Sequence, residues 1–184
     1  MIDRQEASDA LAEIATIAKK VRQSTIYQTA SANLIMWGIL VFAGYVATYF
    51  APRAALWIWS GVMVIGIAGW IVLAAWKRRQ AKVESFNARL LIAVLLFLAF
   101  GVFTILLGHF GPRQISAFWP IYFMLVYTIV GLWTGLAFVV IGLSIAALTL
   151  FGYVFIGEAF SLWMAFVNGG GLVLGGLWMR RDQD

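Results

Sequence analysis

The sequence predicts an all-α membrane protein: six transmembrane helices, arranged as three helical hairpins, behind an N-terminal amphipathic helix. Two observations predict this class. The chain of 184 residues is 63% hydrophobic and 11% charged, with a mean hydropathy of +0.92. Its charges also leave uncharged runs of 30, 23, 23, 44 and 21 residues. Each run is long enough to cross a bilayer core of about 30 Å at about 1.5 Å per helical residue.

Three parts follow along the chain. We expect an amphipathic cytoplasmic or juxtamembrane helix over 1–30, a six-helix transmembrane domain over 31–179 and a short cytoplasmic tail over 180–184. The chain is too short to hold a separate soluble domain beside six spans. One membrane domain is therefore predicted.

The N-terminal helix is predicted from apolar residues at alternating spacings of four and three. These residues are Ala7, Leu11, Ile14, Ala18 and Val21. Such spacing places them on one helix face. The acids come first and the bases Lys19, Lys20 and Arg22 come last, as the helix dipole favours. This helix either docks a partner or lies along an anionic leaflet, or it is a charged extension of the first span.

The six spans are predicted at 31–50, 54–76, 90–109, 115–133, 136–155 and 159–179. The uncharged run of 44 residues from Gln114 to Gly157 must hold two of them. As one helix it would be about 66 Å long, which is over twice the bilayer core. We expect the chain to turn back at Gly131–Gly135.

The positive-inside rule predicts the orientation. With six spans, one side of the membrane carries 11 of the 13 Lys and Arg residues, and the other carries only Arg53 and Arg113. Basic residues accumulate on the cytoplasmic side of short loops. We therefore expect a bacterial-type inner, or plasma, membrane protein with both termini in the cytoplasm.

The connections on the other side resemble one another. Phe50-Ala51-Pro52-Arg53 and Phe110-Gly111-Pro112-Arg113 each lead into a helix with an early Trp, and Ile156-Gly157-Glu158 is a weaker third copy. Two interpretations fit. The hairpins are related by a pseudo-threefold repeat, as in many transporters, or the bilayer imposes the same tip on every hairpin.

Basic residues between the second and third spans carry a similar ambiguity. Lys77, Arg78 and Arg79 directly follow the second span. They form a lipid or partner surface in one interpretation and ordinary stop-transfer charges in the other.

Asn168 is the polar residue of greatest interest at membrane depth. It lies near the centre of the sixth span, and the glycines Gly169, Gly170, Gly171 and Gly175 follow it. A weakened helix beside a polar side chain would make a midplane transport site. Small residues four apart would instead make a close-packed helix contact, with the Asn hydrogen-bonded across it.

The outer tips hold the remaining candidates, Arg53, Arg113 and His109. The two arginines would form an anion-attracting rim or serve as snorkelling anchors. His109 is the single histidine, and we expect a solvated loop residue. One histidine cannot supply two axial haem ligands.

The sequence favours a non-catalytic protein. The chain has no cysteine, and no Asp, Glu, Lys or Arg falls in the middle of a predicted span. We expect no enzyme activity, no cofactor, no bound metal and no nucleic-acid partner. The leading hypothesis is a subunit, scaffold or regulator that packs against a membrane-protein partner or a second copy of itself in the lipid bilayer. The alternative is an uncoupled small-solute transporter or channel.

Overall fold

The computed structural model describes residues 4–81 and 88–181, which are almost entirely helical. In chain order the elements are α1 (Arg4–Phe50), the 3-10 turn η1 (Pro52–Ala54), α2 (Ala55–Ala81), α3 (Ala88–Gly108), α4 (Pro112–Thr134), α5 (Leu136–Phe155), α6 (Phe160–Met164), the π-helical turn η2 (Ala165–Gly170) and α7 (Gly171–Arg181). Segments α6, η2 and α7 follow one another directly.

Six segments are long and apolar enough to cross a membrane, as the sequence predicts. They are Tyr27–Phe50, Pro52–Trp76, Leu91–Gly108, Pro112–Thr134, Leu136–Phe155 and Phe160–Arg181. The run of 44 uncharged residues does turn back, at Gly135, whose φ of 154° is one that side-chain-bearing residues rarely adopt. This composition is consistent with a multi-pass membrane protein.

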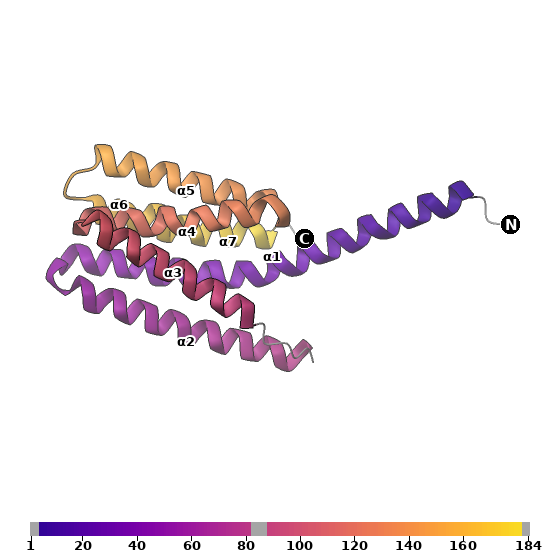
Figure 1. The fold of residues 1–184 in the computed structure, drawn as a ribbon, viewed down its shortest axis with the longest axis horizontal. Coiled ribbons are helices and arrows are strands. Elements are labelled where there is room, and N and C mark those ends of the chain that lie inside the picture. The colour runs from indigo at the N-terminus through magenta and orange to yellow at the C-terminus, as the bar shows by residue number, and fades with distance from the viewer. Residues whose placement is uncertain (1–3, 82–87, 182–184) are drawn as a thin grey trace.

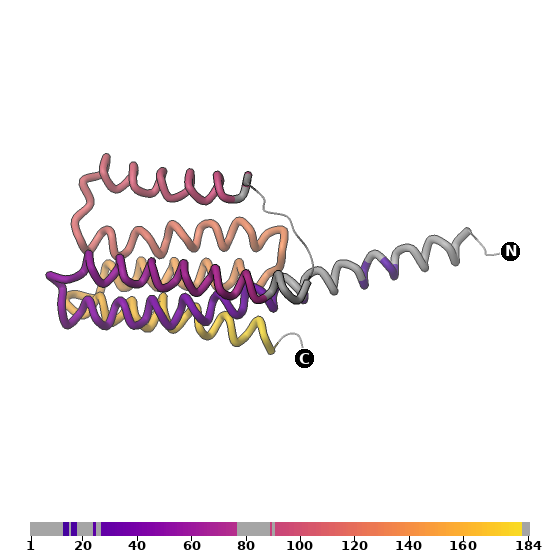
Figure 2. The backbone as a smooth tube through the Cα atoms, turned by 90° about the horizontal axis from the view of Figure 1, so that it is seen from below, coloured from indigo at the N-terminus to yellow at the C-terminus, as the bar shows by residue number. Residues whose placement is uncertain are grey.

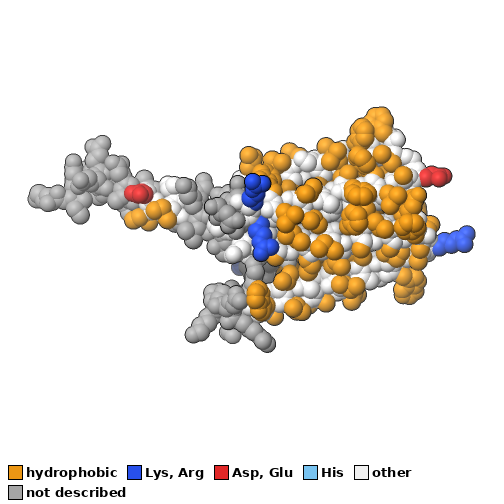
Figure 3. Space-filling view, turned by 180° about the vertical axis from the view of Figure 1, so that it is seen from behind, with side chains coloured by type: hydrophobic (Ala, Val, Ile, Leu, Met, Phe, Trp, Pro, Cys, Tyr) orange, Lys and Arg blue, Asp and Glu red, His pale blue; other side chains and the backbone are white. Residues whose placement is uncertain are grey.

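The helices form an elongated bundle with unequal ends (Figure 1). The α1–α2, α3–α4 and α5–α6 connections lie at one end. The α4–α5 turn and the C-terminus lie at the other. Charged side chains visible on the rear face of the bundle are likewise at its two ends, with an apolar surface between them (Figure 3).

Helix α1 continues without a break from Arg4 to Phe50. Its N-terminal part extends well beyond the bundle, roughly along the bundle's long axis (Figure 1). The predicted N-terminal helix and the first span are therefore one helix.

The closest helix packing does not follow the predicted hairpins. Helix α4 packs most extensively on α5, and α1 packs most extensively on α7 and η2. Helix α2 packs on α1, whereas α3 makes few contacts with α4 and lies at the edge of the bundle (Figure 2). The pseudo-threefold repeat stays a prediction.

The core lies where α1, α4, α5 and the last span meet. One apolar cluster includes Leu34 of α1, Met124 of α4, Ile141 of α5 and Met179 of α7. A second, which includes Tyr45 of α1 and Met164 of α6, lies toward the end with the three connections.

Candidate functional site

Asn168 lies in the π-helical turn η2 rather than in an unwound segment. The glycines after it do not break the span, because α7 begins directly at Gly171. Its side chain is buried, with 7% exposed. Widening of a helix to a π turn is often found at functional sites.

Tyr45 of α1 completes the polar surroundings of this turn. Its hydroxyl donates a hydrogen bond of 2.8 Å to the backbone oxygen of Ser116 in α4. The Asn168 side chain lies near that hydroxyl. The Tyr45 ring, which is 2% exposed, meets the ring of Trp59 in α2 edge-on, with centroids 4.8 Å apart. Tyr45 of α1 therefore lies close to α2, α4 and η2 at one point of the bundle.

The Ser116 oxygen needs this hydroxyl because of Pro120. In an α-helix the N–H of residue 120 would donate to the oxygen of residue 116, and proline has no N–H. An unpaired carbonyl is costly inside a membrane domain. No sequence motif marks Tyr45 as part of this site, although Pro120 within a span indicates that one carbonyl requires another donor.

The glycines of the sixth span pack against two different helices. A Cβ added at Gly169 would lie 2.6 Å from the Cα of Phe42 in α1. Gly171 and Gly175 face α5, where added Cβ atoms would lie 3.1 and 2.6 Å from Ile145 and Ile141. Around Gly170 there is open space. Two glycine faces of this span are thus occupied within the chain, so a contact with another protein has to use other surfaces.

Arg113 and Arg53 lie at the same end of the bundle but in different surroundings. The Arg113 guanidinium donates to the backbone oxygens of Tyr153 at 2.8 Å, Gly157 at 3.2 Å and Ile156. It also lies over the rings of Tyr153 and Phe160, 5.4 and 5.1 Å from the centroids. A cation bonded to the last carbonyls of a helix stabilises its C-terminus, here that of α5.

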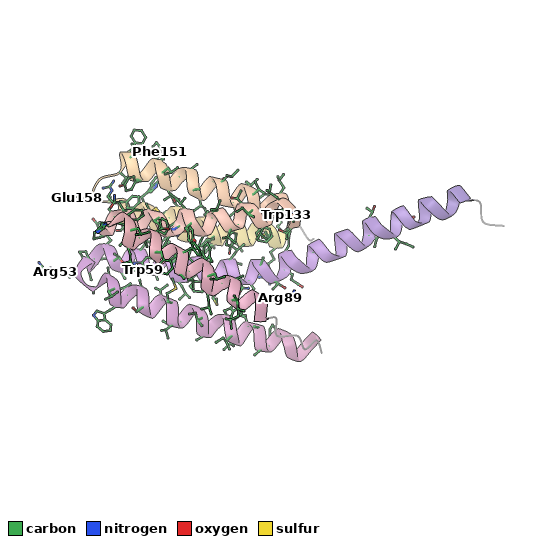
Figure 4. All side chains as sticks on the ribbon, viewed as in Figure 1. Arg53, Trp59, Arg89, Trp133, Phe151 and Glu158 are labelled. Carbon is green, nitrogen blue, oxygen red and sulfur yellow. The ribbon has the colours of Figure 1, made fainter. Side chains whose placement is uncertain are left out.

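Arg53 is exposed in η1 and points away from the bundle, near the end where Glu158 also lies (Figure 4). Its side chain and that of Arg113 are thus not equivalent, although both follow a proline. Three of the five guanidinium N–H donors of Arg113 thus bind carbonyl oxygens within the protein, and two are left for another acceptor.

His109 is exposed and ends α3. Its φ is 49°, and its N–H and that of Phe110 donate to the oxygens of Leu106 and Ile105 at 3.4 and 3.3 Å. This is the pattern of bonds that closes a helix with one left-handed residue. The Nδ1 atom of the ring lies 3.1 Å from the oxygen of Leu107. The structure therefore gives His109 a local role in the turn.

The structure does not describe the basic side chains of the two predicted surfaces. The side chains of Lys19, Lys20, Arg22, Lys77, Arg78 and Arg79 lie outside the described residues. On the same N-terminal helix Ile14 and Ile17 are 62% and 54% exposed. Among the residues that the structure describes, no three His, Asp or Glu side chains come together as metal ligands.

Comparisons with protein-family models, curated proteins and solved structures find no match to this chain.

Proposed function

We propose that this is a non-catalytic multi-pass membrane protein that acts by helix association, and that the N-terminal part of α1 pairs with the same segment of a second copy. In this role the protein is a scaffold or a self-associating subunit. The observation that carries the proposal is the N-terminal extension of α1, whose Ile14 and Ile17 are exposed beyond the bundle.

The direction of the extension supports a protein partner over a lipid surface. The extension runs roughly along the bundle axis (Figure 1). If that axis crosses the membrane, the extension leads away from the bilayer and its apolar residues meet water. A helix in water gains most of its stability from packing of an amphipathic face.

The sequence of the extension suits a parallel two-helix coiled coil. Spacings of four and three from Ala7 to Val21 are those of the a and d positions. All charged residues between these two positions then fall on the outer b, c and f positions. These residues are Asp9, Glu13, Lys19 and Lys20. A seam without charge selects no oppositely charged partner, which favours pairing of identical helices.

The distribution of Lys and Arg residues agrees with an extension that leads away from the bilayer. We place the end with both termini in the cytoplasm of a bacterial-type plasma membrane, following the basic residues of the connecting segments. Two copies in one membrane then present their extensions side by side and parallel.

Single cysteines test the pairing cleanly because the natural chain has none. Ile14→Cys lies on the predicted seam, and Ala12→Cys lies on the outer face of the same helical turn. In native membranes under mild oxidation we expect disulfide-linked dimers from Ile14→Cys at about ten times the yield of Ala12→Cys, since a disulfide needs Cα atoms within about 7 Å. Equal yields would refute the coiled coil. If deletion of residues 1–24 abolishes the oligomers but Ile14→Cys gives no cross-link, the extension contacts its partner in a different geometry.

A second function is favoured by one observation, the π-helical turn with Asn168 buried beside Tyr45. An uncoupled carrier of small neutral solutes could use such a midplane site. Its test is flux of glycerol and urea into vesicles that contain the protein. A carrier gives flux above that of empty vesicles, and Asn168→Ala lowers it. Flux equal to that of empty vesicles rejects this function.

A further inference from the structure

One face of α1 stays exposed along the part of the helix that lies within the bundle. We call it the exposed α1 face, and its residues are Gln28, Ile39, Ala43, Ala47 and Phe50. Ile39 and Phe50 are 57% and 77% exposed. The residues of α1 that pack into the two core clusters, such as those at positions 34 and 45, lie on the other side of the helix.

The exposed α1 face is in line with the predicted coiled-coil seam, which runs from Ala7 to Val21. An α-helix turns once in about 3.6 residues, so positions 18 or 36 apart lie above one another. Ala43, Ala47 and Phe50 each lie 36 positions after one of the first three seam residues, and Ile39 lies 18 positions after the last. Since α1 is unbroken, the seam and the exposed face form one line along the same helix.

A strict heptad repeat would lead elsewhere. Continued into the bundle, spacings of four and three from Val21 reach Ile35 and Phe42. Both pack within the chain, against Gly176 and Gly169 of the last span, where added Cβ atoms would lie 2.8 and 2.6 Å from them. A heptad seam drifts by about 20° per heptad around a straight helix. A contact that continues into the bundle therefore has to pass from the heptad positions to the exposed α1 face.

Pairing of the extensions brings two such faces together. Paired helices lie about 8–10 Å apart, and each helix of the pair continues without a break into its own exposed α1 face. Two parallel copies in one membrane are related by a twofold axis along the membrane normal, so each residue near the axis meets its own counterpart. Ala43 and Ala47 are four residues apart, and small residues at this spacing allow two helices to approach closely.

Gln28 gives the same face a polar group that suits an identical partner. It lies seven residues after Val21, at the equivalent heptad position, and in the first turn of the span that begins at Tyr27. An amide both donates and accepts, so two Gln28 side chains can hydrogen-bond to each other. A lipid chain offers no such partner. Gln28 therefore favours a second copy over lipid on this face.

We propose that the exposed α1 face is the contact between two copies of this chain within the membrane. The two α1 helices then stay side by side from the extension to the end of the bundle that holds the α1–α2 connection (Figure 1). This inference rests on the proposed pairing of the extensions, and it adds a second contact surface inside the bundle.

Cysteine cross-linking within the membrane tests this contact. Ala43→Cys lies on the exposed α1 face. Val64→Cys in α2 is the matched control because Val64 is 68% exposed. Val62 packs beside Gly44 of α1, so position 64 lies at about the depth of position 43. Two residues further along a helix is about 200° around it, so Val64 faces away from α1.

In native membranes oxidised with copper phenanthroline, we expect disulfide-linked dimers from Ala43→Cys at about ten times the yield of Val64→Cys. A disulfide needs Cα atoms within about 7 Å, which only residues near the twofold axis achieve. Ala47→Cys, one turn further along the same face, repeats the measurement at a second exposed position. The product should have twice the mass of the chain.

Yields at positions 43 and 47 no greater than at position 64 would overturn this inference. If Ile14→Cys still cross-links in that case, the extensions pair while lipid separates the helices in the membrane, and the proposed function stands. Cross-linking at 43 without cross-linking at 14 would keep the membrane contact and reject the coiled coil. A product of any other mass would show that a different protein occupies the face, which also overturns the inference.

Discussion

The third and sixth spans are opposites in composition and in position. The third span, Leu91–Gly108, has the highest mean hydropathy of the six at 2.8, and only 6% of it is buried. The sixth span, Phe160–Arg181, has the lowest at 1.4, and half of its most apolar 18 residues are buried. In a soluble protein the order would be reversed, since apolar residues go inside.

Lipid removes the usual reason for apolar residues to be buried. Leucine gains nothing by leaving hydrocarbon, so membrane helices associate through close packing and hydrogen bonds instead. Small residues in the sixth span allow α1 and α5 to approach, and its neighbour Tyr45 supplies a hydrogen bond between helices. Helix α3 has bulky side chains and makes few contacts with α4, among them the stacked rings of Phe97 and Tyr122, whose centroids lie 4.2 Å apart. Hydropathy thus predicts which segments enter the membrane, and small residues predict which of those segments pack in the core of the bundle.

The largest expected effect comes from adding one methyl group to the core. Gly169→Ala would place a Cβ 2.6 Å from the backbone of Phe42, which has no flexible end to move aside. We expect a loss of about 2–3 kcal/mol in the free energy of unfolding. Titration with SDS in mixed micelles, followed by circular dichroism, measures it.

The adjacent glycine is the matched control. Gly170→Ala meets nothing within 4 Å and replaces a poor helix former by a good one. Its stability should stay within about 1 kcal/mol of the parent, on the stabilising side. Equal losses in the two variants would mean that helix α1 does not press on Gly169.

A smaller effect is expected from the hydroxyl of Tyr45. Tyr45→Phe leaves the Ser116 oxygen without a donor, and we expect a loss of about 1–2 kcal/mol. Pro120→Ala restores an N–H that can reach the same oxygen, so in that background Tyr45→Phe should cost about 1 kcal/mol less. A double-mutant cycle measured by the same SDS titration gives this coupling. Additive losses would show that the cost of Tyr45→Phe does not come from an unpaired Ser116 carbonyl.

The sequence was sufficient for the six spans and for the turn at Gly135, because charge and hydropathy decide which segments enter a bilayer. It was not sufficient for the neighbours of those spans. Tyr45 and Ser116 are 71 residues apart, and no local pattern pairs them. Hairpins that are adjacent in sequence were the natural expectation, yet α1 packs most extensively on α7.

The candidate site shows the same division. Asn168 and its glycines were recognisable from the sequence, since a polar residue and a glycine run are unusual at membrane depth. The π-helical turn and the direction in which each glycine faces depend on tertiary packing.

The smallest effect is expected at the edge of the bundle. Tyr122 in α4, like Tyr45, donates from its hydroxyl to a backbone oxygen of another helix, here that of Phe97 at 3.0 Å. Residue 101 is a glycine and not a proline, so the Phe97 oxygen keeps its ordinary helical donor when the tyrosine hydroxyl is lost. Tyr122→Phe should therefore cost only about 0.5 kcal/mol, the size of an average side-chain hydrogen bond within a membrane protein. The SDS titration that compares Tyr122→Phe with Tyr45→Phe tests whether the partner carbonyl, rather than the hydroxyl, decides the cost. A loss at Tyr122 as large as that at Tyr45 would show that α3 is held as firmly as the core helices, and the contrast between the third and sixth spans would then not extend to their stability.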